Sequence, residues 1–154
     1  MKTALKLILP LLFLLSSCAY DTIAPEPDVP DTNQVEFVKE DGADPTLEAN
    51  QDRMTDNVWI TRGNSGGQIF NIKVSQSYNK NNSPLDTEWA VGDKADKDNL
   101  TFTTFRNAVK PQSIVGQDLV VHLITDDIYL NVRFTSWSSS KRGGFSYIRD
   151  RVPE

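Results

Sequence analysis

The stretch DLVVHLITDDIYLNVRFTSW, residues 118–137, carries the clearest secondary-structure signal in the chain. Two runs of β-forming residues flank the polar sequence Thr125-Asp126-Asp127, which predicts an antiparallel hairpin with a tight turn. In the second arm an apolar set alternates with a polar and aromatic set, so the two sets should face opposite sides of a sheet. The apolar set is Ile128, Leu130, Val132 and Phe134, and the other set is Tyr129, Asn131, Arg133, Thr135 and Trp137.

Shorter β-rich runs occur on both sides of this hairpin, separated by Gly, Asn and Asp. They predict further strands at 58–61, 68–74, 87–91, 100–106 and 145–149. In the second of these, Phe70, Ile72 and Val74 should share one face. No ten-residue stretch combines helical spacing with capping residues. We therefore predict an all-β fold, a single antiparallel β-sandwich or jelly-roll-like domain over residues 57–154.

The first 18 residues, MKTALKLILPLLFLLSSC, have the order of a bacterial lipoprotein signal. Lys2 and Lys6 precede an apolar run of nine residues (7–15), which is too short to span a bilayer. The residues LSSC that follow resemble a lipobox, in which the cysteine thiol receives a diacylglycerol and becomes the mature N-terminus. We predict a signal peptide at 1–17 and lipidation, with chains such as palmitate, at Cys18; the alternative is an ordinary signal peptide with a cysteine near its cleavage site.

Cys18 is the only cysteine in the sequence, so no internal disulfide can form. A lipid anchor at this residue makes the lipid bilayer the first expected partner. Ala19 follows the cysteine instead of the aspartate that retains proteobacterial lipoproteins at the inner membrane, which favours the outer membrane. The sequence leaves open whether the protein faces the cell surface or the periplasm.

Charge is divided unevenly along the chain. Residues 19–56 contain 11 acidic and 2 basic residues, a net charge of −9, whereas residues 57–154 contain 10 acidic and 12 basic residues, a net charge of +2. With its prolines, this composition predicts an acidic, flexible tether over 18–56, in which Val35, Phe37 and Val38 allow one short strand. Asp21-Thr22-Ile23 resembles an O-glycosylation signal of Bacteroidota, with Thr22 as the acceptor. Neither half has the dense basic face that nucleic acid requires.

Four segments, read together, resemble a small all-β domain that recurs in secreted and surface proteins of marine Bacteroidota and Proteobacteria, often appended to larger proteins. The segments are NVWITRGNSGG, SPLDTEWAVG, VVHLITDDIYLNVRFTSW and GGFSYIRD, and the resemblance covers about residues 55 to 150. It implies a β domain outside the cytoplasm. No enzymatic activity is assigned to that domain, so the resemblance implies no chemistry.

The letters GNSGG at 63–67 are those that surround the nucleophile in many chymotrypsin-like proteases, with Ser65 at the nucleophile position. That chemistry needs a histidine base upstream of the serine, but the single histidine, His122, comes after it. A nucleophile elbow would need a helix after the loop, where we predict a strand. We therefore predict no enzymatic activity and interpret 63–67 as a hairpin loop, whose turn Asn64 and Ser65 should hydrogen-bond. The pattern around His122 is typical of a packed or edge histidine.

Carboxylates and aromatic residues are the remaining candidates for a site. Asp126 and Asp127, at the hairpin tip, are weak calcium candidates, and the aspartates of GDKADKDN (Asp93, Asp96 and Asp98) are weaker because lysines alternate with them. Solvated turns are the preferred interpretation, and we predict no metal and no cofactor. Tyr129, Arg133 and Trp137 share one predicted face and form the candidate surface for a glycan or an envelope protein.

These observations predict a membrane-anchored, non-catalytic lipoprotein of the cell envelope that acts as a binding or assembly module. Its alternative is a carbohydrate-binding accessory lipoprotein of a polysaccharide-utilisation system. A small hydrolase that uses Ser65 is the third and weakest interpretation.

Overall fold

A computed structural model describes residues 32–110 and 113–154. The predicted signal peptide (1–17), Cys18 and Thr22 lie outside these residues. No helix in the described part of the chain is long and apolar enough to cross a bilayer. The strands are β1 (Gln34–Lys39), β2 (Asp52–Arg53), β3 (Trp59–Arg62), β4 (Ile69–Asn71), β5 (Thr87–Val91), β6 (Asp118–Leu123), β7 (Ile128–Trp137) and β8 (Phe145–Asp150). The short helices are η1 (Glu48–Asn50), η2 (Lys94–Asn99) and α1 (Phe105–Ala108).

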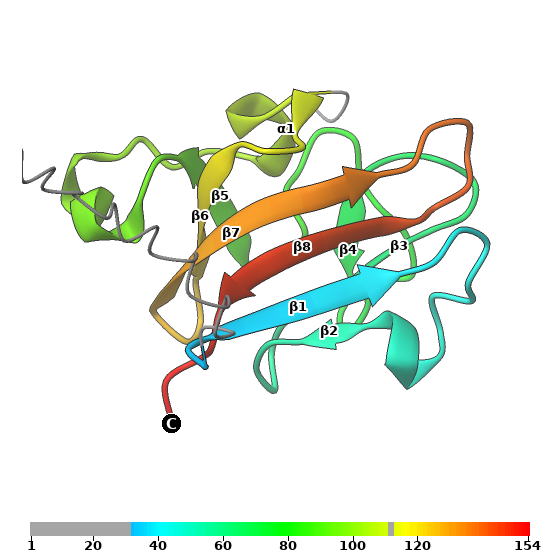
Figure 1. The fold of residues 1–154 in the computed structure, drawn as a ribbon, viewed down its shortest axis with the longest axis horizontal. Coiled ribbons are helices and arrows are strands. Elements are labelled where there is room, and N and C mark those ends of the chain that lie inside the picture. The colour runs from blue at the N-terminus through cyan, green and yellow to red at the C-terminus, as the bar shows by residue number, and fades with distance from the viewer. Residues whose placement is uncertain (1–31, 111–112) are drawn as a thin grey trace, which may run out of the picture.

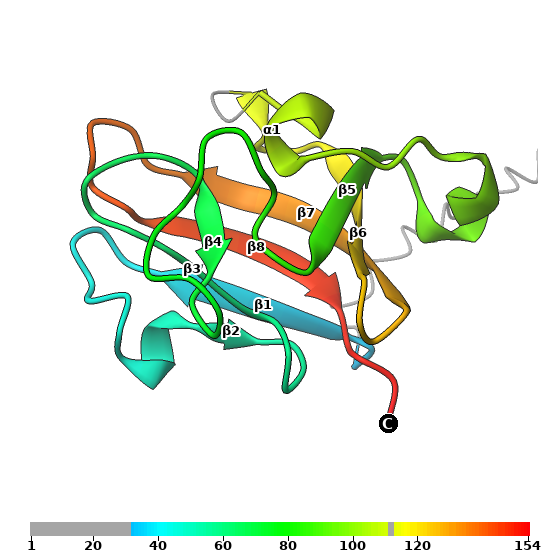
Figure 2. The ribbon, with the colours of Figure 1, turned by 180° about the vertical axis from the view of Figure 1, so that it is seen from behind.

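Two antiparallel sheets form the layers of the domain. The large sheet has the strand order β1-β8-β7-β6-β5, and the small sheet has the order β2-β3-β4. The small sheet lies behind the large one in Figure 1 and in front of it in Figure 2. The core lies between the layers and contains Trp89, Phe105, Phe134, Phe145 and Tyr147, all of which are 1% exposed or less. The prediction of an all-β sandwich is confirmed.

The hairpin of β6 and β7 is also confirmed, with a register that runs from Asp118 opposite Arg133 to Leu123 opposite Ile128. Its turn contains Asp127 at a φ of 53°, in the left-handed region that aspartate adopts more readily than most residues. The apolar set of β7 faces the core, as the alternation of its side chains predicts.

One residue of the opposite set does not follow the prediction. A β-bulge interrupts β7 between Phe134 and Ser136, where two residues of β7 lie opposite the single residue Ser146. Trp137 consequently pairs with Phe145 and packs against the core, as Phe134 does. The prediction that Trp137 shares a face with Tyr129 and Arg133 is wrong, because the extra residue in the bulge shifts the side-chain alternation by one.

The predicted boundary of the tether at residue 56 is wrong as well. Residues 32–56 belong to the folded domain: β1 pairs with β8 over six residue pairs, and Phe37 packs on Phe145 and Tyr147. The acidic composition concealed this, because the acidic residues of the segment point outward except for Asp52. The part of the predicted tether before residue 32 lies outside the described residues and stays a prediction.

Asp52 is buried because it joins the two sheets. Its Oδ2 accepts hydrogen bonds from Tyr147 Oη and Arg149 Nε, and its Oδ1 accepts one from Arg149 Nη2, each at 2.7 Å. A fork-to-fork pair of this kind compensates both charges and fixes their geometry. The bonds connect β2 of the small sheet with β8 of the large sheet, so they set how the layers face each other.

Two predicted strands are shorter or absent, each for a local reason. The strand predicted at 68–74 ends at Asn71, whose buried side chain accepts from the backbone N–H groups of Trp59 and Lys73 and leaves Val74 exposed. The strand predicted at 100–106 is reduced to one bridge between Thr103 and Trp89. It is followed by helix α1, where the Thr104 hydroxyl caps the N-terminus by accepting from the Asn107 N–H.

Candidate functional site

The GNSGG segment (63–67) connects β3 to β4 as a hairpin loop, which confirms its predicted role as a turn. Gly67 has a φ of +94°, and a Cβ at this position would overlap the ring of Tyr78, so only glycine fits. Asn64 does not bond its own turn as predicted. Its Nδ2 donates to the Ala43 carbonyl at 2.9 Å, and its Oδ1 accepts from Lys39 Nζ at 3.0 Å.

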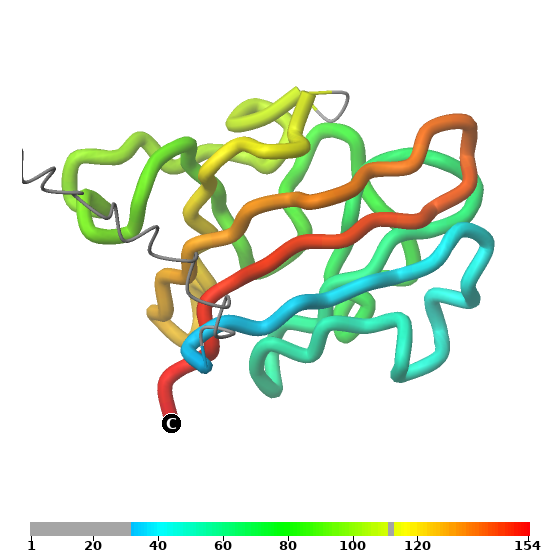
Figure 3. Tube along the Cα trace, viewed as in Figure 1, coloured from blue at the N-terminus to red at the C-terminus, as the bar shows by residue number. Residues whose placement is uncertain are grey.

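Three loops that are distant in sequence meet at this end of the sandwich: 40–47, 63–67 and 138–144. They lie together at the right-hand end of Figure 3, where β1, β3 and β7 finish. Backbone and ion-pair contacts join the first loop to the third, since Gly42 N donates to the Arg142 carbonyl and Arg142 pairs with Asp41 at 3.1 Å. Gly143 has a φ of +80° and packs directly on Asn64. The three loops thus form one connected unit.

Two buried cationic side chains, Lys39 and Arg62, donate hydrogen bonds to these loops from inside the domain. Lys39 is 1% exposed, and its Nζ donates to Asn64 Oδ1 and to the Gly143 carbonyl at 3.3 Å. Burial, and then the positive charge of Arg62, lower the pKa of Lys39. No carboxylate of the described residues lies within ion-pair distance of this ammonium group.

Arg62, at the end of β3, is the second buried cation and is 4% exposed. Its Nε donates to the Gly67 carbonyl, and its Nη1 donates to the carbonyls of Ser138 and Gly144, all at 3.0 Å. The guanidinium lies over the Trp137 ring, 3.9 Å from the ring centroid, in a cation–π contact. Burial lowers the pKa of Arg62 to about 10. Arg62 forms no ion pair with a described carboxylate, although the charge of Asp41 opposes part of the effect of burial.

A pocket with a volume of about 460 Å³ opens beside Arg62, and we call it the loop-end pocket. It is lined by Arg62, Gly66, Gly67, Gln68, Arg106, Val115, Trp137, Ser138, Ser139, Ser140 and Lys141. Three of these residues are cations and none is acidic. Neither Arg106 nor Lys141, both exposed, forms an ion pair with a described residue. The pocket therefore carries positive charge that no ion pair with a described residue neutralises.

Gln68, which also lines the pocket, contains a second unmatched group. This residue is 4% exposed, and its Nε2 donates to the carbonyls of Asn79 and Asn82. A carbonyl oxygen can only accept, so the amide atom that bonds both carbonyls is the nitrogen. The other amide atom is therefore the oxygen Oε1. It is buried and accepts no hydrogen bond from any described residue, although buried polar atoms are nearly always paired.

The residues predicted to form one aromatic surface lie in two places. Tyr129 stacks on His122 with ring centroids 4.0 Å apart, and it also contacts Phe102 and the Lys97 ammonium. Arg133, on the same outer face of the large sheet, forms an ion pair with Asp118. Trp137 lies in the loop-end pocket instead, with one ring face covered by Arg62.

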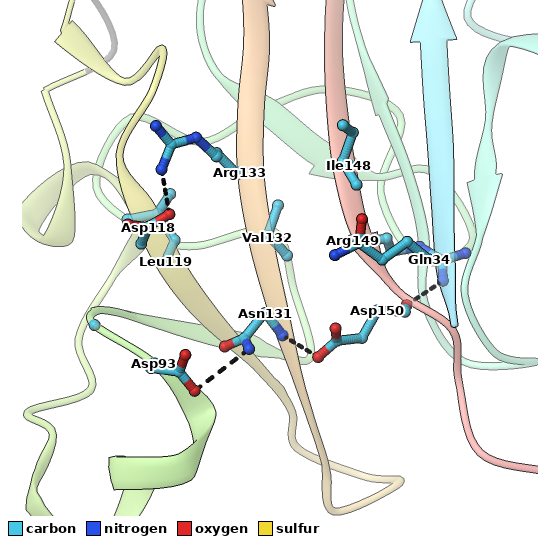
Figure 4. A pocket seen from close by; sticks show the side chains of 11 residues that line it. Gln34, Asp93, Asp118, Leu119, Asn131, Val132, Arg133, Ile148, Arg149 and Asp150 are labelled. Atoms are coloured by element: carbon cyan, nitrogen blue, oxygen red, sulfur yellow. Dashed lines mark hydrogen bonds and ion pairs between the residues drawn. The ribbon is translucent and has the colours of Figure 1, made fainter. Parts of the chain in front are cut away.

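A pocket of about 240 Å³ on the outer face of the large sheet contains Arg133, and Figure 4 shows its side chains. Its polar groups largely neutralise one another. Arg133 bonds Asp118, and Asn131 lies between Asp93 and Asp150, as the dashed lines in Figure 4 show. Asp150 also pairs with Lys94 at 2.7 Å. This sheet-face pocket offers a ligand fewer unmatched groups than the loop-end pocket does.

His122 is not hydrogen-bonded to Ser65 in the structure. His122 Nδ1 lies 2.8 Å from Glu88 Oε1 and its Nε2 lies 3.1 Å from Asp127 Oδ1, so both ring nitrogens have carboxylate partners. No described serine is hydrogen-bonded to His122. Ser65 is exposed in its loop and is not among the residues that line the loop-end pocket.

The calcium candidates are occupied by contacts within the chain. Asp126 accepts from Thr55 Oγ1 at 2.6 Å and from Asn57 Nδ2 at 2.8 Å, and Asp127 bonds His122. Asp93 caps η2 by accepting from Ala95 N, and Asp98 pairs with Lys97. Within residues 32–110 and 113–154, no group of three or more His, Cys, Asp or Glu side chains has an arrangement that could hold a metal ion.

The sequence did not indicate Arg62, Gln68, Arg106 and Lys141 as site residues. Each comes from a different segment, and nothing in their local spacing links them. The one available signal was the glycine-rich loop, because close approach of backbone to other groups often marks a site. That loop is indeed at the pocket, although its serine is not.

Comparison with known proteins found no match among protein-family models, curated proteins or solved structures. The resemblance to a recurring β domain of envelope proteins therefore stays a prediction.

Proposed function

We propose that this chain is a lipid-anchored, non-catalytic lipoprotein of the cell envelope, and that its β domain is a binding module. The ligand site in this proposal is the loop-end pocket. The observation that supports it is the set of cations, Arg62, Arg106 and Lys141, that converge on one pocket without a carboxylate partner among the described residues. Burying an unpaired guanidinium costs stability, and folded proteins keep such costs mainly at functional sites.

The contacts that connect the loops around the pocket fit a binding role. The loops that surround the pocket are joined by Asn64, by the Asp41–Arg142 ion pair and by the three carbonyls that Arg62 bonds. Groups that are held in position before the ligand arrives lose less entropy on binding. A module for assembly or capture needs this property.

The anchor is supported by the order of charge, apolar run and cysteine in the first 18 residues. We expect mass spectrometry of the mature protein to find an N-terminal Cys18 with diacylglycerol. The Cys18→Ser variant should move from the membrane fraction to the soluble fraction of the cell. An unmodified thiol on membrane-bound protein would refute the anchor.

Binding is tested with the full-length chain, purified in detergent and applied to an array of envelope glycans, environmental polysaccharides and peptidoglycan fragments. The matched variant is Arg106→Gln/Lys141→Gln, which changes two exposed side chains at the pocket and spares the core. The control is Arg151→Gln, an exposed cation outside the pocket. We expect at least one glycan on the array to retain the unchanged chain and the control, but not the double variant. If no glycan retains the unchanged chain, or if the double variant and the Arg151→Gln control are retained equally, the pocket is not the ligand site.

A carbohydrate-binding accessory lipoprotein of a polysaccharide-utilisation system is the second candidate. Gln68 Oε1 favours it, because a sugar hydroxyl that reaches this wall would supply the donor that the atom lacks. No described contact favours a hydrolase that uses Ser65.

A further inference from the structure

The chemistry of the loop-end pocket narrows the class of ligand, and the inference rests on the proposed binding function. We infer that the pocket binds an acidic sugar unit of a polysaccharide: a sugar ring that carries a carboxylate or a sulfate. Three properties of the site lead to this class: its charge, its unpaired acceptor and its size.

The charge of the pocket selects an anion. Arg62, Arg106 and Lys141 line it, and no acidic side chain does. Arg62 uses Nε and Nη1 for loop carbonyls, and its hydrogen bonds to described residues do not involve Nη2. A guanidinium held against Trp137 in this way presents a fixed donor to a carboxylate or sulfate oxygen, and such charge-assisted hydrogen bonds are strong.

The low polarity around Arg62 strengthens this preference. Burial lowers its pKa to about 10, which shows that the protein environment disfavours the positive charge. An anion in the pocket would compensate that charge, and electrostatic attraction is larger where water is excluded. The bound state would thus recover part of the free energy lost on burying the guanidinium.

The unpaired acceptor argues against a bare inorganic anion. Gln68 Oε1 needs a hydrogen-bond donor, which a sulfate or carboxylate ion does not have. The hydroxyl groups of Ser139 and Ser140 line the same pocket and can both donate and accept. A sugar unit supplies hydroxyl donors and an anionic substituent in one molecule, so it matches both kinds of group.

The size of the pocket is consistent with a sugar ring. Its volume of about 460 Å³ lies within the range of roughly 300–1,000 Å³ that is typical of small-molecule sites. Stacking of a base on Trp137 is disfavoured because Arg62 covers one face of that ring. The domain also lacks the basic stripe that nucleic acid requires.

Matched pairs of oligosaccharides test the inference with the full-length chain. The first pair is β-1,4-linked oligomannuronate and the corresponding manno-oligosaccharide, which differ in the carboxylate at each ring. The second pair is dextran sulfate and dextran. Isothermal titration calorimetry measures each affinity for the unchanged chain, for Arg106→Gln/Lys141→Gln and for the Arg151→Gln control.

We expect at least one acidic oligosaccharide to bind more tightly than its neutral counterpart by about tenfold or more, since hydrogen bonds to charged groups are the strong ones. The double variant should lose most of that difference, and the control should keep it. Arg62→Lys keeps the positive charge but removes the forked N–H donors of the guanidinium, so it should lose an intermediate part of that affinity difference. A melting curve for each variant verifies that it is folded.

Three outcomes would overturn the inference. Equal, pocket-dependent affinity for the neutral member of each pair would exclude an acidic ligand while leaving the binding function intact. Pocket-dependent binding of poly-glutamate at higher affinity than either acidic sugar would assign the pocket to an acidic peptide. Absence of binding to all four oligosaccharides would overturn the inference, and the array described above then decides whether the binding function itself survives.

Discussion

Two buried arginines of the sandwich have opposite surroundings. Arg149, between the sheets, is 6% exposed and meets Asp52 in a bidentate pair. Arg62, at the loop end, is 4% exposed and meets three carbonyls and the Trp137 ring. Burial by itself would lower both pKa values, yet the pKa of Arg149 is raised because the hydrogen bonds and charge of Asp52 outweigh burial. The pKa of Arg62 falls to about 10.

The difference shows that Arg149 is paired within the domain and stabilises the fold, whereas Arg62 has no ion-pair partner among the described residues and is the one that an anionic ligand would pair with. Asp52 completes Arg149 inside the described domain, so this pair joins β2 to β8 and leaves little for an external group to satisfy. Arg62 is held by backbone carbonyls and the Trp137 ring, and the charge of Asp41 offsets only part of the effect of burial. An external anion would have a role beside Arg62 that it would not have beside Arg149.

The largest effect is expected from Asp52→Ala. It leaves the Arg149 guanidinium and the Tyr147 hydroxyl buried without their acceptor, which should lower the free energy of unfolding by about 3–5 kcal/mol. Urea denaturation measures this value. The control is Asp56→Ala, an exposed acid in the same segment, which should stay within about 0.5 kcal/mol of the unchanged chain. Equal stability of the two variants would show that the pair does not hold the sheets together.

Arg62→Met should cost less, about 1–3 kcal/mol, because it removes a poorly compensated charge and leaves only the carbonyl acceptors of the loops unsatisfied. The same urea experiment measures the loss. A cost as large as that of Asp52→Ala would mean that the loops neutralise Arg62 as fully as Asp52 neutralises Arg149. The contrast between the two arginines would then disappear.

The pH dependence of the free energy of unfolding at alkaline pH should give the next largest difference between the inter-sheet region, with Tyr147, and the loop end, with Arg62. Burial, and then the charge of Asp52, raise the pKa of Tyr147 well above its ordinary value of 10.0. The unfolded chain therefore loses this proton first, and above pH 10 the free energy of unfolding should fall by about 1.4 kcal/mol per pH unit from this residue. Arg62 acts in the opposite direction between its folded pKa of about 10 and its ordinary 12.5, because there the unfolded chain binds more protons.

Urea denaturation at a series of alkaline pH values measures this dependence. Tyr147→Phe should make the decline less steep, and Arg62→Met should make it steeper. Parallel curves for the three proteins would contradict the assignment of these two pKa shifts.

The smallest expected difference in stability is between two substitutions within the GNSGG loop. Asn64→Ala removes bonds to Ala43 and Lys39 and should destabilise the domain by about 1–2 kcal/mol, because Lys39 remains buried with one acceptor fewer. Ser65→Ala, one residue away and exposed, should change stability by less than about 0.5 kcal/mol. Thermal melting of the two variants compares them. A larger loss for Ser65→Ala would show that the serine has a structural role not visible in its contacts.

The sequence predicted the elements whose signal is local. The hairpin of β6 and β7 follows from the alternation of side chains around one turn, and the loop at 63–67 follows from its glycines. Contacts between distant residues were not predictable in this way. Asp52 and Arg149 are 97 residues apart, and the composition around Asp52 was typical of a tether. Trp137 was misplaced by the single extra residue of a bulge, which leaves no mark in the alternation of residue types.

The path of β1 places the start of the folded domain at the end opposite the loop-end pocket. Backbone contacts hold Asn33 beside Arg151, next to the C-terminus, so the chain joins the domain at the end opposite the three loops (Figure 1). With Cys18 as the proposed anchor, 14 residues would separate the lipid from Thr32, a reach of at most about 50 Å. A proposed anchor at Cys18 would therefore attach at the end of the domain opposite the loop-end pocket, which leaves the pocket accessible to a polymer beyond the membrane surface.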